Sequence, residues 1–142
     1  MSFSTDREIA ELARRFRERT LPKAGWTHAA HFAVALHLLR TRGAATYTEM
    51  PPMIRAHNEA TGVANTETDG YHETITIASI RAADSWLASA PPARALHRIL
   101  SDLLASAFGR SDWLFVYWSQ ERLFSPEARK HWVDPDLAPL DF

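Results

Sequence analysis

Two short segments concentrate the side chains that could do chemistry. Residues 26–31 read Trp-Thr-His-Ala-Ala-His, and residues 70–74 read Gly-Tyr-His-Glu-Thr. In each segment a polar residue suited to a helix N-terminus is followed by a stretch with helical apolar periodicity. We therefore expect His28, His31, His72 and Glu73 to lie near the starts of two helices, at the rim of the core.

A divalent metal is the first chemistry that these residues suggest. Catalytic zinc and ferrous iron take three protein ligands and keep one position open for water or substrate. We take His28, His31 and His72 as the metal ligands, with His72 and Glu73 as the catalytic residues and Glu73 as a fourth ligand or general base. The chain would then be a small metal-dependent enzyme, either a hydrolase or an oxygenase. The spacing is not that of a zincin, because position 76 is threonine instead of histidine.

The convergence of the two segments depends on topology. In an up-and-down bundle the second and fourth helices run parallel, so their N-termini meet at one end. His28 and His31 are three residues apart and share a helix face, so they can face one ligand together. Taken singly, each histidine is better explained as a hydrogen-bonded capping or core residue.

A metal-free pocket is the second hypothesis. Helix N-termini present positive partial charge and free N–H groups, which favour anions over cations. In this arrangement the histidines and Arg55 donate hydrogen bonds to an anionic small molecule, and Glu73 transfers a proton. Arg55, Asn65 and Tyr71 are the candidate substrate-binding residues, and the Gly-, Asn- and Thr-rich residues 61–69 are a candidate lid.

The third hypothesis is an interaction or assembly protein. The aromatic residues 113–118 would then form a dimer face, making the chain a homodimer.

Composition excludes several other classes. The chain has 142 residues and is 46% hydrophobic, enough for a core without staples, so residues 1–142 are expected to form a single domain. The formal charge of −1 provides no field toward nucleic acid or an anionic membrane. The absence of cysteine excludes disulfides and thiolate zinc sites. Since no run is long enough to span a membrane, we expect a cytoplasmic protein.

Apolar periodicity predicts an all-α, compact bundle of five or six helices. The second helix, apolar nearly all round, should be the most buried. A strand over residues 74–77 competes with the fourth helix because these residues alternate and include β-branched side chains. The aromatic residues 113–118 should be buried within a helix that reaches Leu123. The main expected spans are residues 5–17, 27–42, 50–61, 72–89, 93–108 and 112–123, and a last short helix is expected over residues 125–132.

Four segments together carry a resemblance to a family of small bacterial helical proteins. They are residues 26–31, 58–66, 70–74 and 118–125, and the Gly-Tyr-His-Glu-Thr block is the most specific. The resemblance implies one domain but no particular activity. In architecture the chain is also similar to the DinB-like bundles, which hold a metal with three histidines. That family places a His-x-x-x-His pair late in the chain, and this sequence has no such pair.

Overall fold

The computed structural model describes residues 3–142, and all its regular elements there are helices, which confirms the predicted all-α fold. The predicted helix, and not the competing strand, begins after His72. Single 3₁₀ turns and short connections join the α-helices. Their bounds are α1 Asp6–Arg17, α2 His28–Arg42, α3 Thr46–Ala60, α4 Glu73–Ser89, α5 Leu96–Ala105, α6 Gln120–Leu123 and α7 Pro126–Lys130.

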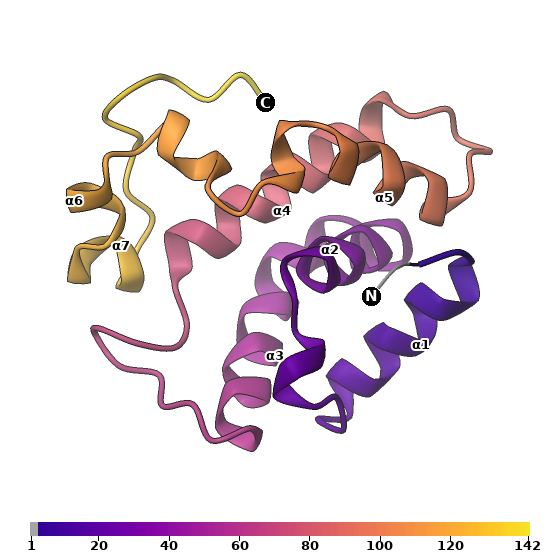
Figure 1. Cartoon of the computed structure of the whole chain (residues 1–142), viewed down its shortest axis with the longest axis horizontal. Coiled ribbons are helices and arrows are strands. Elements are labelled where there is room, and N and C mark those ends of the chain that lie inside the picture. The colour runs from indigo at the N-terminus through magenta and orange to yellow at the C-terminus, as the bar shows by residue number, and fades with distance from the viewer. Residues whose placement is uncertain (1–2) are drawn as a thin grey trace.

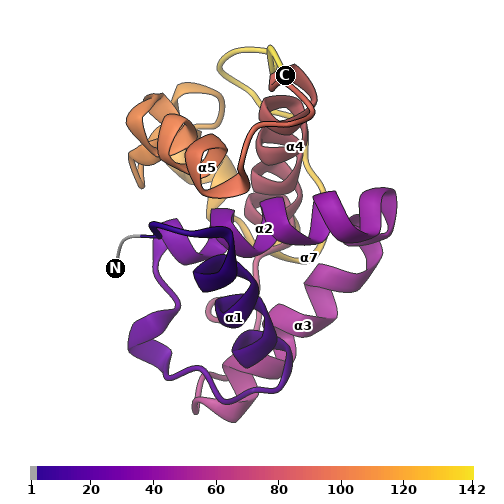
Figure 2. The same cartoon turned by 90° about the vertical axis from the view of Figure 1, so that its right-hand side faces the viewer.

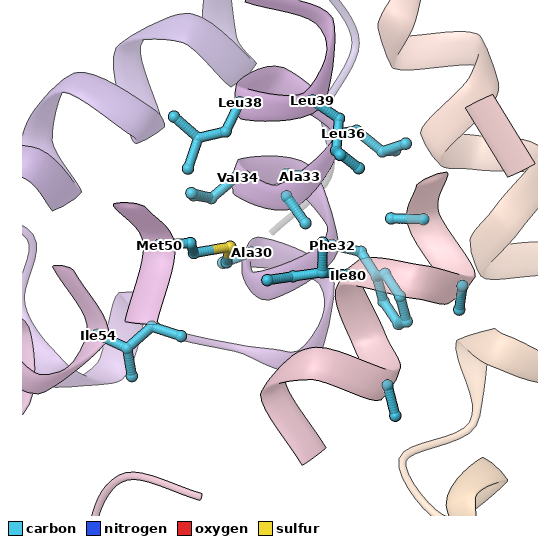
Figure 3. Close-up of a cluster of buried hydrophobic side chains, with 14 of the residues drawn as sticks. Ala30, Phe32, Ala33, Val34, Leu36, Leu38, Leu39, Met50, Ile54 and Ile80 are labelled. Atoms are coloured by element: carbon cyan, nitrogen blue, oxygen red, sulfur yellow. The ribbon is translucent and has the colours of Figure 1, made fainter. Parts of the chain in front are cut away.

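Helix α2 is the centre of the core, as its all-round apolar sequence predicts. Eight of its residues are buried, including the uninterrupted run from Phe32 to Leu36. Met50 and Ile54 of α3 lie on one side of α2, and Ile80 of α4 lies on the other (Figure 3). Because apolar burial is the dominant favourable term in folding, α2 determines where the other helices pack.

The helices do not form the expected up-and-down bundle. Helix α4 crosses α2 and does not run alongside it (Figure 2). The short helices α6 and α7 lie together beside the start of α4, and the C-terminal segment then returns along α4 (Figure 1). The premise that the second and fourth helices run parallel is therefore wrong.

Helix α3 begins earlier than predicted. Because proline is tolerated in the first turn of a helix, Pro51 and Pro52 predict a start near residue 50. In the structure both prolines lie inside a helix that starts at Thr46. Thr46, Met50 and Ile54 are all buried at helical spacing, so packing against the core outweighs the two backbone hydrogen bonds that the prolines remove.

The aromatic segment is not one long helix. Residues Trp113–Val116 form a 3₁₀ helix, the chain then breaks, and α6 starts after the capping residue Ser119. The break lets Trp118 point into the core, where its indole N–H donates to the Val133 carbonyl at 3.0 Å. The last short helix likewise ends at Lys130, so it does not carry His131 and Trp132 as predicted.

Among the residues that the structure describes, no helix combines the length and the apolar character that crossing a membrane requires.

Candidate functional site

The start of α2 holds two of the predicted metal ligands. Thr27 is the N-cap, and its hydroxyl accepts a hydrogen bond from Ala30 N at 3.1 Å. The His28 imidazole is therefore not needed as a cap and reaches outward, where its Nε2 lies 2.7 Å from the Phe108 carbonyl oxygen. Since a carbonyl only accepts, Nε2 carries the hydrogen in this contact.

His31 lies among aromatic rings. Its ring centroid is 5.3 Å from that of Trp26 and 6.3 Å from that of Phe32. Burial, with a smaller contribution from the neighbouring His28, lowers the pKa of His31 to about 4. At neutral pH this imidazole is therefore uncharged.

The start of α4 uses its histidine differently, because His72 itself is the N-cap. Its Nδ1 accepts a hydrogen bond from Ile75 N at 3.1 Å, and its Nε2 donates to the Leu123 carbonyl at 2.6 Å. Burial lowers the pKa of His72, which favours this neutral form. Nδ1 thus caps α4 itself, and Nε2 joins α4 to the end of α6.

Thr74 adds a second link between α4 and the C-terminal helices. Its hydroxyl lies 2.7 Å from the Ala128 carbonyl and 2.9 Å from the His131 carbonyl, and it accepts a hydrogen bond from Val133 N at 3.2 Å. The side chain is fully buried. His72 and Thr74 together satisfy backbone groups at the ends of α6 and α7 that would otherwise be unpaired.

The three histidines do not fit a metal as they are placed. His72 has no free ring nitrogen, and the Nε2 of His28 faces a carbonyl. Across residues 3–142, no three His, Asp or Glu side chains are arranged so that they could hold a metal ion. Binding through His72 would require breaking at least one of its hydrogen bonds.

A different group forms where α3 meets the start of α4. The Arg55 guanidinium lies over the Tyr71 ring, with Cζ 4.1 Å from the ring centroid. The Tyr71 hydroxyl donates to Glu73 Oε1 at 2.5 Å. Burial and the hydrogen bond to Glu73 raise the pKa of Tyr71, so the phenol keeps its proton at neutral pH. The structure thus brings together three of the predicted site residues and leaves His28 and His31 in contacts with other partners.

Asn65, another predicted substrate-binding residue, has a structural role. Its Oδ1 accepts hydrogen bonds from Asn58 Nδ2 and Tyr71 N, both at 3.0 Å. Its Nδ2 donates to the Arg55 carbonyl at 3.2 Å. Asn65 therefore fixes the loop against α3 and orients the backbone that carries Tyr71.

The loop over residues 61–69, predicted as a lid, also contacts α7. Arg129 of α7 donates to the Gly70 carbonyl at 3.0 Å, and Lys130 pairs with Glu67. Neither Arg129 nor Lys130 was predicted to lie in this region. Their only signal is their position in the last turn of a short basic helix, which is equally well explained by the helix dipole.

The aromatic segment is only partly buried. Trp113, Leu114 and Trp118 are in the core, whereas Val116 is 64% exposed and the neighbouring Phe124 is 54% exposed. An apolar hollow of about 540 Å³ opens beside Val116, between Phe108 and Tyr117. The expectation of a fully buried segment is therefore wrong, and the dimer hypothesis stays a prediction.

Comparison with protein-family models, with curated proteins and with solved structures gave no match. The site is therefore interpreted from its geometry.

Proposed function

We propose that the protein binds a small organic anion, without a metal, at the group formed by Arg55, Tyr71 and Glu73. One observation carries the proposal: a single tyrosine ring supports a guanidinium on its face and a carboxylate at its hydroxyl. Arg55 is exposed and has no carboxylate within ion-pair distance among residues 3–142. Its planar fork of donors is suited to a carboxylate or phosphate.

Glu73 restricts which anions could bind beside Arg55. A second anion placed beside this carboxylate would be repelled, so the part of the ligand that faces Glu73 must donate a hydrogen bond. Tyr71 occupies Oε1, which leaves Oε2 for that donor. A small hydroxy acid, with its carboxylate on Arg55 and its hydroxyl on Glu73, satisfies both groups. Glu73 would then be the acceptor if a ligand proton is transferred.

Titration followed by two-dimensional NMR tests this proposal. Lactate should shift the signals of Tyr71, Glu73 and the Arg55 side chain in a saturable way, and propionate, which lacks the hydroxyl, should bind at least about 10-fold more weakly. Arg55→Gln should weaken lactate binding by at least about 10-fold. Arg98→Gln is the matched control, because Arg98 is also exposed and unpaired among the described residues.

Two results would overturn the proposal. One is the absence of saturable shifts at this group with lactate and with inorganic phosphate. The other is retention of a stoichiometric zinc or iron in protein purified without a histidine tag, with loss of that metal in His28→Ala and His31→Ala, which would support the metal-dependent alternative instead.

A further inference from the structure

A second hollow lies beside α4, under the C-terminal segment. It has a volume of about 490 Å³ and is lined by Arg81, Trp132 and residues 134–140. The segment that forms its wall leaves α7, runs along α4 and ends near the far end of that helix (Figures 1 and 2). Its volume falls within the range of small-molecule sites.

Arg81 is the cation of this hollow. Its Cζ lies 5.3 Å from the centroid of the Trp132 ring, and its Nη2 donates to the Phe142 carbonyl at 3.3 Å. No Asp or Glu side chain lies within ion-pair distance of Arg81 in the part of the chain that the structure describes. A guanidinium has five N–H donors, so most of those on Arg81 remain free for a ligand.

Two carboxylates provide the opposite charge. Asp134 accepts a hydrogen bond from the Trp132 indole N–H at 3.0 Å. Asp136 accepts two from Ser119, which lower its pKa and keep it ionised. The hollow therefore contains one positive and two negative side chains.

This charge distribution indicates which charges a ligand must carry. A simple anion would be attracted by Arg81 but repelled by both aspartates, and a simple cation would meet Arg81 unpaired. A zwitterion satisfies both signs. The remaining wall is apolar, and its Leu137 side chain is 59% exposed, so an apolar group on the ligand would cover surface that the fold leaves in water.

We infer that the hollow between Arg81, Trp132 and Asp134 binds a free α-amino acid with an apolar side chain. The ligand carboxylate lies on Arg81, its ammonium group faces Asp134, and its side chain packs on Trp132 and Leu137. This site shares no residue with the anion site formed by Arg55, Tyr71 and Glu73.

The test uses leucine and two analogues that each lack one charge. Leucine should shift the Trp132 indole N–H signal in a saturable NMR titration. The analogues 4-methylpentanoate, without the amine, and isopentylamine, without the carboxylate, should each bind at least about 10-fold more weakly.

Variants separate this site from the first one. Arg81→Gln should weaken leucine binding by at least about 10-fold. Asp134→Asn keeps an acceptor for the indole N–H but removes the charge, so it should also weaken binding while the Trp132 signal stays in place. Arg55→Gln should leave the leucine-dependent shift of the Trp132 indole signal unchanged. An unchanged melting temperature in each variant verifies that the fold is intact.

The inference is overturned if leucine gives no saturable shift at millimolar concentration. It is also overturned if 4-methylpentanoate binds as well as leucine, or if folded Arg81→Gln binds leucine as the original protein does.

Discussion

The starts of α2 and α4 look alike in sequence but differ in what their histidines do. In α2, Thr27 is the cap, so the ring of His28 is free to contact the Phe108 carbonyl and that of His31 to pack against Trp26. In α4, His72 is itself the cap, so one ring nitrogen is used by the helix and the other by the Leu123 carbonyl. The difference shows that a histidine at the N-cap has little freedom to act as a ligand.

The two segments also differ in what they hold together. The His72 and Thr74 side chains join α4 to α6 and α7, which are too short to be stable alone. At the α2 start, by contrast, a single hydrogen bond from His28 reaches the Phe108 carbonyl, and His31 packs against Trp26. We therefore expect changes in residues 70–74 to cost more stability than changes in residues 27–31.

The largest effect is expected at Gly70. Its φ of +79° disfavours any L side chain, and an added Cβ would overlap the Ala64 carbonyl and lie 2.7 Å from Asn65 Oδ1. We expect Gly70→Ala to lower the free energy of unfolding by about 3–5 kcal/mol, from backbone strain plus displacement of the loop. Gly62→Ala is the matched control, since Gly62 has a φ of +83° but open space around it, and should cost only about 1–2 kcal/mol. Equal losses in urea unfolding would show that the close approach at Gly70 is unimportant.

The next largest effect is expected on lowering the pH, because of the partly buried His31. Its pKa is about 4 in the folded protein, against about 6.5 in the unfolded chain, so between these values only the unfolded chain binds the proton. Stability should therefore fall as the pH drops from 6.5 to 4, by about 3 kcal/mol, and this loss should level off below pH 4. The lowered pKa values of His72 and His37 act in the same direction. Urea unfolding at several pH values measures the slope, and His31→Phe should reduce it; an unchanged slope would contradict the assignment to His31.

Removing the Thr74 hydroxyl should have a similar or slightly smaller effect. Thr74→Val keeps the shape but leaves Val133 N–H and a carbonyl unpaired in a fully buried position, at a cost of about 2–3 kcal/mol. Thr48→Val, on the exposed face of α3, should change stability by less than about 0.5 kcal/mol. If the two variants unfold at the same urea concentration, the Thr74 hydroxyl does not stabilise the contact between α4 and α7.

The smallest expected difference in stability is between variants of the two N-cap residues, His72 and Thr27. His72→Ala loses both the cap and the bond to Leu123 and should cost about 2 kcal/mol, whereas Thr27→Ala loses only a cap and should cost about 1 kcal/mol. His72→Asn should recover the cap but not the Leu123 bond, so its stability should lie between those of His72→Ala and the original protein. Thermal or urea unfolding of the three variants decides this order.

Much of the fold follows from the sequence because it depends on local patterns. The Thr27 cap and the buried α2 are readable from capping chemistry and apolar periodicity, and so is the helix after His72. The start of α3 was also readable, since Thr46, Met50, Ile54 and His57 form a buried stripe at helical spacing. The preference of proline for the first helical turn led instead to a predicted start near residue 50.

The candidate site was less predictable because it depends on partners distant in the chain. Nothing near His72 indicates that the Leu123 carbonyl, 51 residues on, will accept a hydrogen bond from its ring. The sequence did identify Arg55, Tyr71 and Glu73 separately, but the stacking of Arg55 on Tyr71 depends on the loop that Asn65 fixes. The crossing of α4 over α2, which separates the two helix starts, results from packing that periodicity does not encode.

Long-range ¹H–¹⁵N NMR of the histidine rings tests directly whether His72 is a capping residue or a metal ligand. We expect that His72 is neutral with its hydrogen on Nε2 at pH 7 to 8, and that its signals do not move when zinc or ferrous iron is added. A hydrogen on Nδ1, or a shift of the His72 signals together with those of His28 and His31 on adding metal, would contradict it.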